Sequence, residues 1–143
     1  MREGETGHRG GCLCGAVQYE VEGGLRPALV CHCRMCQQTH GVPAAYSAAK
    51  RDKVALRERR GLAWYASSST ARRGFCRECG ASLFWEPIGG DYWAIACGTL
   101  DQPSGVAIVG HIFVASKGDY YEIADGLPQF EQGTGGRVPG VAV

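Results

Sequence analysis

The sequence predicts a mainly β fold, an all-β sheet or sandwich, in a single domain. The 143-residue chain contains 22 glycines, and this content favours tight turns between short strands over long helices. Hydrophobic and polar residues alternate with a period of two more often than they follow a helical period. Several short segments are also rich in β-branched and aromatic residues, which favour strands.

Five segments have the pattern of strands. Residues 16–21 alternate regularly and are followed by a turn sequence, Glu-Gly-Gly, at residues 22–24. The other candidate strands are residues 62–65, 82–85, 92–96 and 106–114. Short strands at this spacing predict that the cysteines lie in the turns between them.

One short helical turn is expected over residues 34–38, ending before Gly41 and Pro43. Residues 1–9 are polar without periodicity, and residues 131–143 contain four glycines and one proline, so both ends are expected to be flexible tails. The single domain is therefore expected over residues 10–130.

The composition excludes several classes of protein. Hydrophobic residues make up 45% and charged residues 20% of the chain, so wholesale disorder is excluded. No apolar run reaches the roughly 18 residues that a membrane span needs. The first six residues, MREGET, lack the apolar core of a secretory signal, so we expect a cytoplasmic protein with no membrane partner.

The charges are balanced overall but unevenly distributed. Residues 50–77 contain nine basic and two acidic residues, whereas residues 78–143 contain two basic and eight acidic residues. The basic segment has four interpretations: a mixed solvated surface, internal pairing, an anion site or a nucleic-acid patch. It contains few aromatic residues for stacking on bases and the net charge is only +1, so the sequence argues against nucleic acid as a partner.

The eight cysteines are the most informative feature. Cytosolic thiols are kept reduced, so metal ligation is favoured over disulfides. Seven of them form close groups, with Cys97 apart: Cys12-x-Cys14, Cys31-x-Cys33-x-x-Cys36 and Cys76-x-x-Cys79. Seven is the sum of a closed four-ligand structural zinc site and an open three-ligand catalytic one. The local triplet Cys31, Cys33 and Cys36 is the natural open site, which leaves the two pairs as a structural staple between distant segments.

Alternatives to this assignment stay open. His32 or His40 could complete the triplet as a closed zinc site, or the triplet could be a set of redox thiols. The spacings do not match those of common ferredoxins. Cys97 lies in an apolar segment and is expected to be a small buried hydrophobe. His111 could line a pocket or satisfy a hydrogen bond in the core.

An open three-thiolate zinc suits chemistry on a thiol. Such an ion prefers a soft fourth ligand, and coordination lowers the pKa of a substrate thiol from its usual value near ~8.5. A thiolate that adds to an aldehyde gives a hemithioacetal, and the reverse step cleaves a carbon–sulfur bond. The ion could also polarise a carbonyl or hold a water molecule.

The motifs, taken in order, resemble those of the glutathione-dependent formaldehyde-activating enzyme family, which also includes centromere protein V. The resemblance covers about residues 10–130. The matching segments are residues 11–16 (GCLCGA), 31–36 (CHCRMC), 65–68 (YASS), 73–80 (RGFCRECG), Leu83, 98–101 (GTLD), 111–113 (HIF) and 125–130 (DGLPQF).

This resemblance implies an all-β, zinc-stapled fold of the Mss4-like group, with stacked antiparallel sheets and two zinc ions. It implies a structural zinc on Cys12, Cys14, Cys76 and Cys79, and a catalytic zinc on Cys31, Cys33 and Cys36. The implied activity is that of an S-(hydroxymethyl)glutathione synthase, a carbon–sulfur lyase running in reverse. The implied partners are glutathione, or a similar small thiol, and formaldehyde or another small aldehyde.

The chain departs from the family pattern at two places, Thr39-His40 and Asp119-Tyr120-Tyr121, so the floor of the pocket and the substrate are expected to differ. Three thiolates and one Zn²⁺ carry a net negative charge, and glutathione brings two carboxylates, so arginines are expected nearby. Arg72 and Arg73, beside Cys76, are the candidates, unless they are ordinary strand surface or form internal ion pairs.

We therefore expect a zinc-dependent carbon–sulfur lyase that acts on a small thiol and an aldehyde or their adduct. The competing hypothesis is a non-catalytic, zinc-stapled module that binds a protein or nucleic-acid partner through residues 50–77, with salt-sensitive binding for a nucleic acid. A redox-sensing thiol cluster is the third hypothesis. The oligomeric state is open, a homo-oligomer included.

Overall fold

The computed structural model describes residues 7–139 and confirms a mainly β fold. Its strands are β1 (Gly7–Gly11), β2 (Gln18–Glu22), β3 (Ala28–Cys31), β4 (Ala45–Lys50), β5 (Val54–Glu58), β6 (Leu62–Tyr65), β7 (Ala71–Cys76), β8 (Ser82–Pro87), β9 (Tyr92–Ala96) and β10 (Ile108–Ile112). Its helices are α1 (Arg34–Thr39) and the 3₁₀ turns η1 (Arg51–Lys53), η2 (Cys97–Thr99) and η3 (Val114–Ser116). None of these helices is long and apolar enough to span a membrane.

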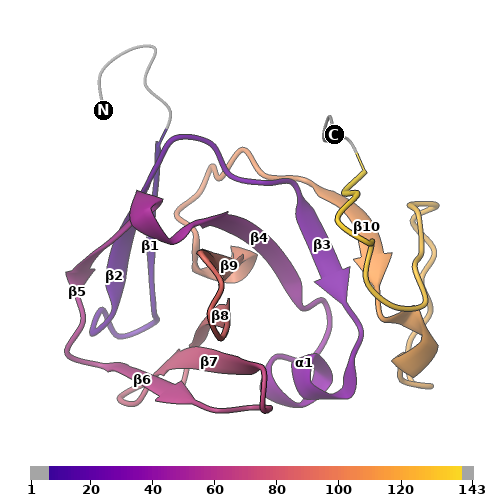
Figure 1. Ribbon diagram of the computed structural model, residues 1–143, viewed down its shortest axis with the longest axis horizontal. Helices are drawn as coiled ribbons and strands as arrows, with labels where there is room; N and C mark the ends of the chain where they lie inside the picture. Colours follow the sequence, from indigo (N-terminus) through magenta and orange to yellow (C-terminus); the bar gives the residue numbers. More distant parts are fainter. Residues whose placement is uncertain (1–6, 140–143) are drawn as a thin grey trace.

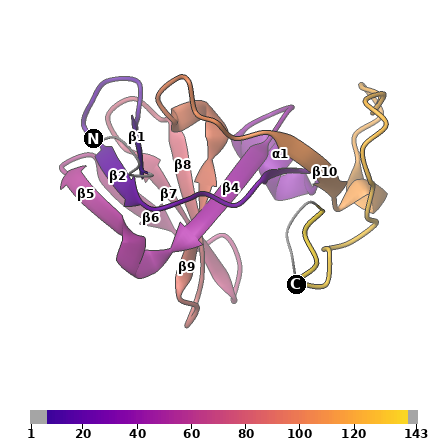
Figure 2. The ribbon, with the colours of Figure 1, turned by 90° about the horizontal axis from the view of Figure 1, so that it is seen from above.

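The strands form two stacked sheets. The small sheet has the order β1-β2-β5, and the large sheet has the order β10-β3-β4-β9-β8-β7-β6. The small sheet lies at one end of the molecule, and α1, β10 and the C-terminal segment lie at the other (Figures 1 and 2). All pairs are antiparallel, as expected for stacked antiparallel sheets, except β10 with β3, which is parallel at the edge of the large sheet.

The predicted strands agree with the structure to within a few residues. The strands β6 and β9 have the predicted limits, and β8 extends two residues beyond its prediction. The strand β2 begins two residues later than predicted, and β10 is shorter because the chain turns into η3. The predicted helical turn is α1, which ends one residue later, at Thr39.

Five strands, β1, β3, β4, β5 and β7, are not identified from the sequence. The strand β1 includes residues 7–9, so the expectation of a flexible N-terminal tail is wrong for these three residues. These residues form a strand because they pair with β2, and no pattern within the segment itself indicates it. The antiparallel ladder pairs Gly7 with Glu22 and Gly11 with Gln18. Residues 1–6 lie outside the described part of the chain.

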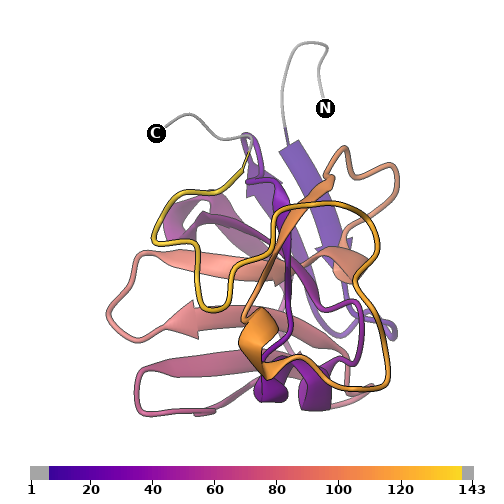
Figure 3. The same ribbon diagram turned by 90° about the vertical axis from the view of Figure 1, so that its right-hand side faces the viewer.

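Residues 131–139 have no helix or strand, but the start of this segment is held against the edge of the large sheet (Figure 3). The backbone N–H of Phe113 donates to the Gln132 carbonyl at 2.9 Å, and that of Ala115 donates to Glu131 at 3.3 Å. Residues 140–143, the end of the predicted C-terminal tail, lie outside the described residues.

The main hydrophobic core lies between the two sheets. Tyr19 and Val21 of β2 contribute to it from the small sheet, and Phe84 of β8 and Ile95 of β9 contribute from the large one. The Tyr19 and Phe84 rings meet edge to face with their centroids 5.2 Å apart. Because successive side chains of a strand point to opposite faces, Trp85 after Phe84, and Ala94 and Ala96 on either side of Ile95, face away from this core.

The other face of the large sheet carries a second, smaller core. Tyr46 of β4 and Ala96 of β9 are buried there with Cys36, and Trp85 and Ala94 pack against them. Ala94 lies directly opposite Trp85 in the ladder between β8 and β9. The helix α1 lies at this side of the sheet (Figure 1), so the sheet supplies a rigid wall to the cysteine triplet.

A polar cluster stabilises the edge of the main core. The Arg72 Nε donates to Glu86 Oε1 at 2.7 Å, its guanidinium lies 4.0 Å from the Trp64 ring centre, and the Trp93 indole N–H donates to Glu86 Oε2. Burial raises the pKa of Glu86, but the hydrogen bonds from Arg72 and Trp93 outweigh it and lower this pKa below its ordinary value. The cluster therefore stabilises the folded state most when Glu86 is ionised.

Replacing Glu86 by glutamine is expected to cost about 1 kcal/mol of unfolding free energy at neutral pH. Because the folded-state pKa is lowered, this contribution is present above the ordinary pKa of 4.5 and is lost as the pH falls through the folded-state value. Urea unfolding of the wild type and of Glu86→Gln should show that the difference between their unfolding free energies shrinks toward pH 3.5. The exposed Glu22, 3.7 Å from Lys53, offers a control in Glu22→Gln, which should change little at any pH. A difference that is constant or grows at low pH would contradict this assignment.

Candidate metal centres

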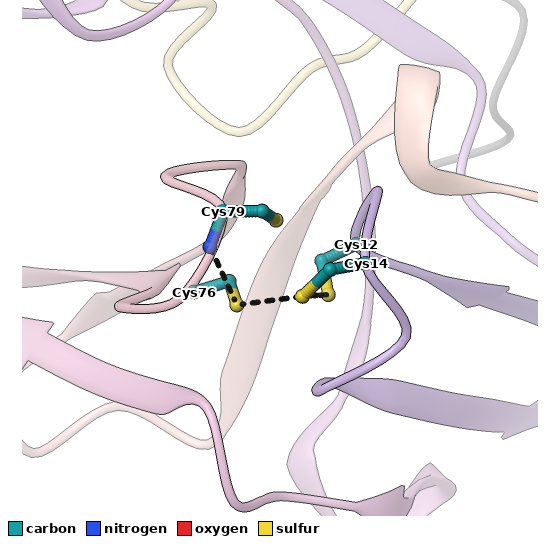
Figure 4. Close-up of side chains that lie close together, drawn as sticks. All are labelled: Cys12, Cys14, Cys76 and Cys79. Carbon is teal, nitrogen blue, oxygen red and sulfur yellow. Dashed lines mark hydrogen bonds between the residues drawn. The ribbon is translucent and has the colours of Figure 1, made fainter.

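Four cysteines from two loops meet between the sheets (Figure 4). Cys12 and Cys14 lie in the loop between β1 and β2, Cys76 ends β7, and Cys79 lies in the turn before β8. Their four sulfur atoms lie within 4.8 Å of one another. The sequence pairs that were expected to staple distant segments therefore join the small sheet to the large one.

The spacing of these sulfur atoms fits a tetrahedral metal ion. The Cys12 and Cys14 sulfurs are 3.8 Å apart, and the Cys14 and Cys76 sulfurs are 3.7 Å apart. Four thiolates bound to zinc at about 2.3 Å would have sulfur atoms about 3.8 Å apart. A closed four-thiolate set at this spacing is typical of a structural zinc site.

Backbone N–H groups support the sulfur atoms. The N–H of Val17 donates to Cys12 Sγ at 3.2 Å, and that of Cys79 donates to Cys76 Sγ at 3.5 Å. The N–H of Ala81, the largest of several such contributions, lowers the pKa of Cys79 to about 6. Gly80 makes the turn possible, because its φ of 81° lies in the left-handed region that favours glycine.

The second group is the triplet Cys31, Cys33 and Cys36, whose sulfur atoms also lie within 4.8 Å of one another. Cys31 ends β3, Cys33 is the N-cap of α1, and Cys36 lies in the first turn of the helix. The Cys36 N–H donates to Cys33 Sγ at 3.3 Å, so the hydrogen bond that caps α1 also holds the Cys33 sulfur in place. Three thiolates make an incomplete tetrahedral set, the pattern of zinc sites that leave one position open.

The triplet lies in a positive environment. Contacts with the Cys31 and Cys36 thiols lower the pKa of Cys33 to about 2, and the charge of Arg73 adds to this. The same contacts, from Cys33 first, raise the pKa of Cys31. Arg73 Nη2 donates to Cys36 Sγ at 3.5 Å.

Arg73 is therefore the arginine that faces the triplet, whereas Arg72 points to the other face of the sheet, where Glu86 binds it. Arg73 Nη1 also lies 3.5 Å from the Tyr46 hydroxyl and from Thr39 Oγ1. The Tyr46 hydroxyl is in turn hydrogen-bonded to His40 Nε2. The buried Arg73 Nε has no hydrogen-bond partner among the described residues.

A cavity of about 330 Å³ opens beside the triplet. Its wall includes all three cysteines, Arg73 and Tyr46, together with aromatic and aliphatic side chains from β3, β8, β9 and β10. The triplet thus combines an incomplete ligand set with an adjacent space that a small molecule can enter, whereas the four-cysteine group is a complete ligand set.

A chain of hydrogen bonds holds the buried His32 side chain in place. Its Nδ1 lies 2.7 Å from the Tyr121 hydroxyl and its Nε2 lies 2.9 Å from His111 Nδ1, while His111 Nε2 lies 2.8 Å from Asp125 Oδ2. His32 and His111 thus satisfy each other's hydrogen bonds in the interior. Tyr121, in a segment that departs from the family pattern, contributes directly to this network.

Neither His32 nor His40 is part of a metal-binding group in the described residues, so the alternatives in which a histidine completes the triplet gain no support. Cys97 is half-buried against the main core and belongs to neither group. Burial raises the pKa of its thiol. The cavity residues Tyr46, Trp85 and Phe113 were not identified as site residues, because no spacing in the sequence relates them to the triplet.

Most of the basic segment is neutralised by acidic partners. Five of its nine basic side chains form ion pairs: Lys50 with Asp91, Lys53 with Glu22, Arg57 with Glu20, Arg60 with Glu58 and Glu78, and Arg72 with Glu86. Arg73 is buried beside Cys36. Internal pairing is therefore the best interpretation of this segment, and the structure offers no support for a nucleic-acid patch.

Comparisons with known proteins agree with this geometry. A family model described as "Glutathione-dependent formaldehyde-activating enzyme" matches residues 7–116. A protein of Schizosaccharomyces pombe named as an uncharacterized lyase is 27% identical over 125 residues, which cover 86% of this chain and 90% of that protein. A crystal structure of a Rhodobacter sphaeroides protein is similar with a TM-score of 0.58 and 25% identity, over 68% of this chain and 91% of that one.

Proposed function

The chain belongs to the glutathione-dependent formaldehyde-activating enzyme family, and from this we propose that it is a zinc-dependent carbon–sulfur lyase. The reaction is the reversible addition of a small thiol, glutathione or one like it, to an aldehyde. In one direction a carbon–sulfur bond forms and gives a hemithioacetal, and in the other that bond is cleaved. The similar lyase from Schizosaccharomyces pombe supports the reaction class.

One observation carries this proposal: the three-cysteine group opens onto a cavity, whereas the four-cysteine group is complete. Zinc held by Cys31, Cys33 and Cys36 would supply one open position for the sulfur of a substrate thiol and would lower the pKa of that thiol. The chain's own residues fix the geometry, because the cap of α1 orients Cys33 and Cys36 and the end of β3 orients Cys31.

Arg73 offsets the charge of the site. An incoming thiolate meets three cysteine thiolates, and a positive charge close to Cys36 reduces the repulsion. Tyr46 holds the guanidinium from the sheet side, so the charge is fixed in position before a substrate arrives. Arg73 is thus a positioning and electrostatic residue for the thiol substrate.

Replacing Arg73 by methionine is expected to raise the KM for the thiol by about tenfold or more, because the buried positive charge is lost. Arg73→Lys keeps the charge but not the forked geometry, so it should recover part of the loss. Steady-state kinetics at several pH values measure this. Equal KM values for the two variants and the wild type would show that Arg73 acts only in packing.

Two measurements test the proposed function: the zinc content of the protein and the rate of exchange between the free aldehyde and its thiol adduct. Elemental analysis of protein purified without chelators should find about two zinc ions per chain. Exchange NMR on mixtures of glutathione and ¹³C-formaldehyde should show faster interconversion of the free aldehyde and its adduct when the protein is present.

One zinc ion per chain would contradict the proposal if the protein also failed to accelerate the interconversion of aldehyde and adduct with glutathione and with other small thiols. The staple alone would then be filled, and a zinc-stapled binding module would be the better interpretation. Reversible disulfide formation in the triplet, with release of metal, would instead indicate a redox sensor.

A further inference from the structure

The cavity beside the cysteine triplet has a size and a chemistry that formaldehyde does not need. We infer that it binds an apolar side chain carried by the aldehyde, so that the substrates are aldehydes with an aromatic or branched aliphatic group, and their thiol adducts. This inference rests on the proposed function and adds the substrate class to it.

The volume is the first argument. The cavity measures about 330 Å³. A water molecule takes up about 30 Å³ in the liquid, so this space holds the equivalent of roughly ten waters. A one-carbon aldehyde would fill only a small part of it and would leave the rest to solvent, whereas a benzyl-sized group would fill much more.

The lining is the second argument. Leu29, Trp85, Ala94, Ile112 and Phe113 give the cavity a continuous apolar wall. Such a wall binds a ligand mainly by removing apolar surface from water. Polar groups of a ligand would lose their hydration against this wall and gain no partner there, so the wall selects an apolar group.

The two arginines at the cavity already make hydrogen bonds within the protein. Arg73 binds Cys36, Tyr46 and Thr39, and Arg26 donates to the backbone carbonyls of Pro27 and Tyr46. The residues that line the cavity include no acidic side chain to bind the ammonium group of glutathione. The peptide body of that thiol therefore fits better outside the mouth, which leaves the interior to the aldehyde's substituent.

Phe113 is the third argument, because its backbone is held in an unfavourable conformation. Its φ of 56° and ψ of 37° lie in the left-handed region, which is unfavourable for a residue other than glycine. The C-terminal segment holds it there, since its N–H donates to the Gln132 carbonyl at 2.9 Å. The conformation coincides with a side chain that lines the cavity, which is the pattern expected of a residue placed for binding.

The mouth is apolar as well. Met35 is 41% and Tyr92 is 36% exposed, and both line the cavity. Met35 follows Cys33 and Arg34 on α1, so a flexible, polarisable side chain lies next to the triplet. Methionine adapts to apolar ligands of different shapes, and this supports a class of aldehydes in place of a single one.

The reaction balances without any further reactant. The thiol sulfur forms a bond to the carbonyl carbon, the π pair of the C=O bond moves to oxygen, and that oxygen takes up the proton released by the thiol. Neither carbon nor sulfur exchanges electrons with an outside oxidant. The substituent on the carbonyl carbon takes no part in bond making, so its effect is on binding.

Binding of two stable thioethers tests the inference without turnover. S-Benzylglutathione and S-methylglutathione differ only in the group that would enter the cavity. Calorimetric titration of the zinc-loaded protein should give a Kd about tenfold or more lower for the benzyl compound. Ala94→Leu extends a side chain into the cavity from β9, so it should abolish this preference. Ala55→Leu, on the edge strand β5 of the small sheet, is the matched control and should preserve it.

Turnover separates this inference from the proposed function. We expect kcat/KM with glutathione to be higher for phenylacetaldehyde than for formaldehyde, and Ala94→Leu to reverse this order. Equal binding of the two thioethers, with formaldehyde turnover intact, would overturn the inference and leave the proposed function standing. No turnover with any aldehyde would overturn the function, while a retained preference for the benzyl thioether would still support an apolar binding site.

Discussion

Replacing Cys33 by serine is expected to lower thiol–aldehyde turnover on the order of 100-fold or more while the fold is retained. Loss of a group that only supports a metal ligand already costs 10- to 100-fold, and a lost ligand should cost at least as much. Serine is among the best helix N-caps, so its hydroxyl can still accept the Cys36 N–H that Cys33 accepts. It is, however, a poor ligand for zinc compared with a thiolate. The variant thus separates metal chemistry from helix capping.

The measurements are turnover, zinc content and thermal unfolding of the same preparations. The variant should keep one zinc ion per chain and unfold within a few degrees of the wild type. Cys97→Ser is the control, because Cys97 is a half-buried cysteine outside both groups and its replacement should leave turnover and zinc content unchanged. If Cys33→Ser retained full turnover, the triplet could not be the catalytic centre.

Replacing Cys14 by serine should have the opposite signature: a large loss of stability. Cys14 is exposed, so its replacement removes almost no packing, and any effect reports on the metal. The loss of a structural zinc that joins two sheets is expected to lower Tm by about 10 °C or more for a domain of this size. Differential scanning calorimetry with parallel zinc analysis measures both quantities.

Addition of a strong chelator to the wild type should reproduce the lower Tm of Cys14→Ser. Cys33→Ser, which loses only the other site, should remain close to the wild-type Tm before chelation. A Cys14→Ser protein with unchanged Tm and full zinc content would contradict a structural role for the four-cysteine group. The two serine variants thus test the division of the cysteines independently of each other.

The grouping of the cysteines could be read from the sequence because it depends on spacing. A Cys-x-x-Cys or Cys-x-Cys turn brings two sulfurs together through its local backbone, whatever the rest of the chain does. The strands β6 and β9 were predictable for a related reason, since their aromatic and branched residues favour strands locally. The structure places the seven sulfurs in the two groups that the ligand count suggested.

Other parts depend on contacts that no local pattern records. The strand β7 reads ARRGFC, with two adjacent arginines, and becomes a strand because β6 and β8 pair with it on both sides. Its two arginines point to opposite faces of the sheet: Arg72 binds Glu86 on one face and Arg73 contacts Cys36 on the other. A sequence motif that contains both cannot say which one faces the triplet until the register of the sheet is known.

The cavity could not be predicted from the sequence for the same reason. Leu29 and Trp85 come from β3 and β8, and Phe113 directly follows β10. Only the parallel pairing of β10 with β3 and the order of the large sheet place them around one space. The metal ligands indicate a reaction type, but the walls that choose a substrate are assembled from distant segments. Substrate preference can therefore change while the cysteine motifs stay the same.

The two cysteine groups also differ in how far apart their members lie along the chain, and this would set the order in which they bind metal ions during synthesis. The triplet is complete within six residues, whereas Cys76 lies 62 residues after Cys14. Closing a loop of that length costs on the order of 3–4 kcal/mol of chain entropy. A growing chain can therefore load the triplet soon after residue 36 emerges. The four-cysteine group can be completed only after the turn that follows β7 has been made, so a metal ion held there would be the last to be bound.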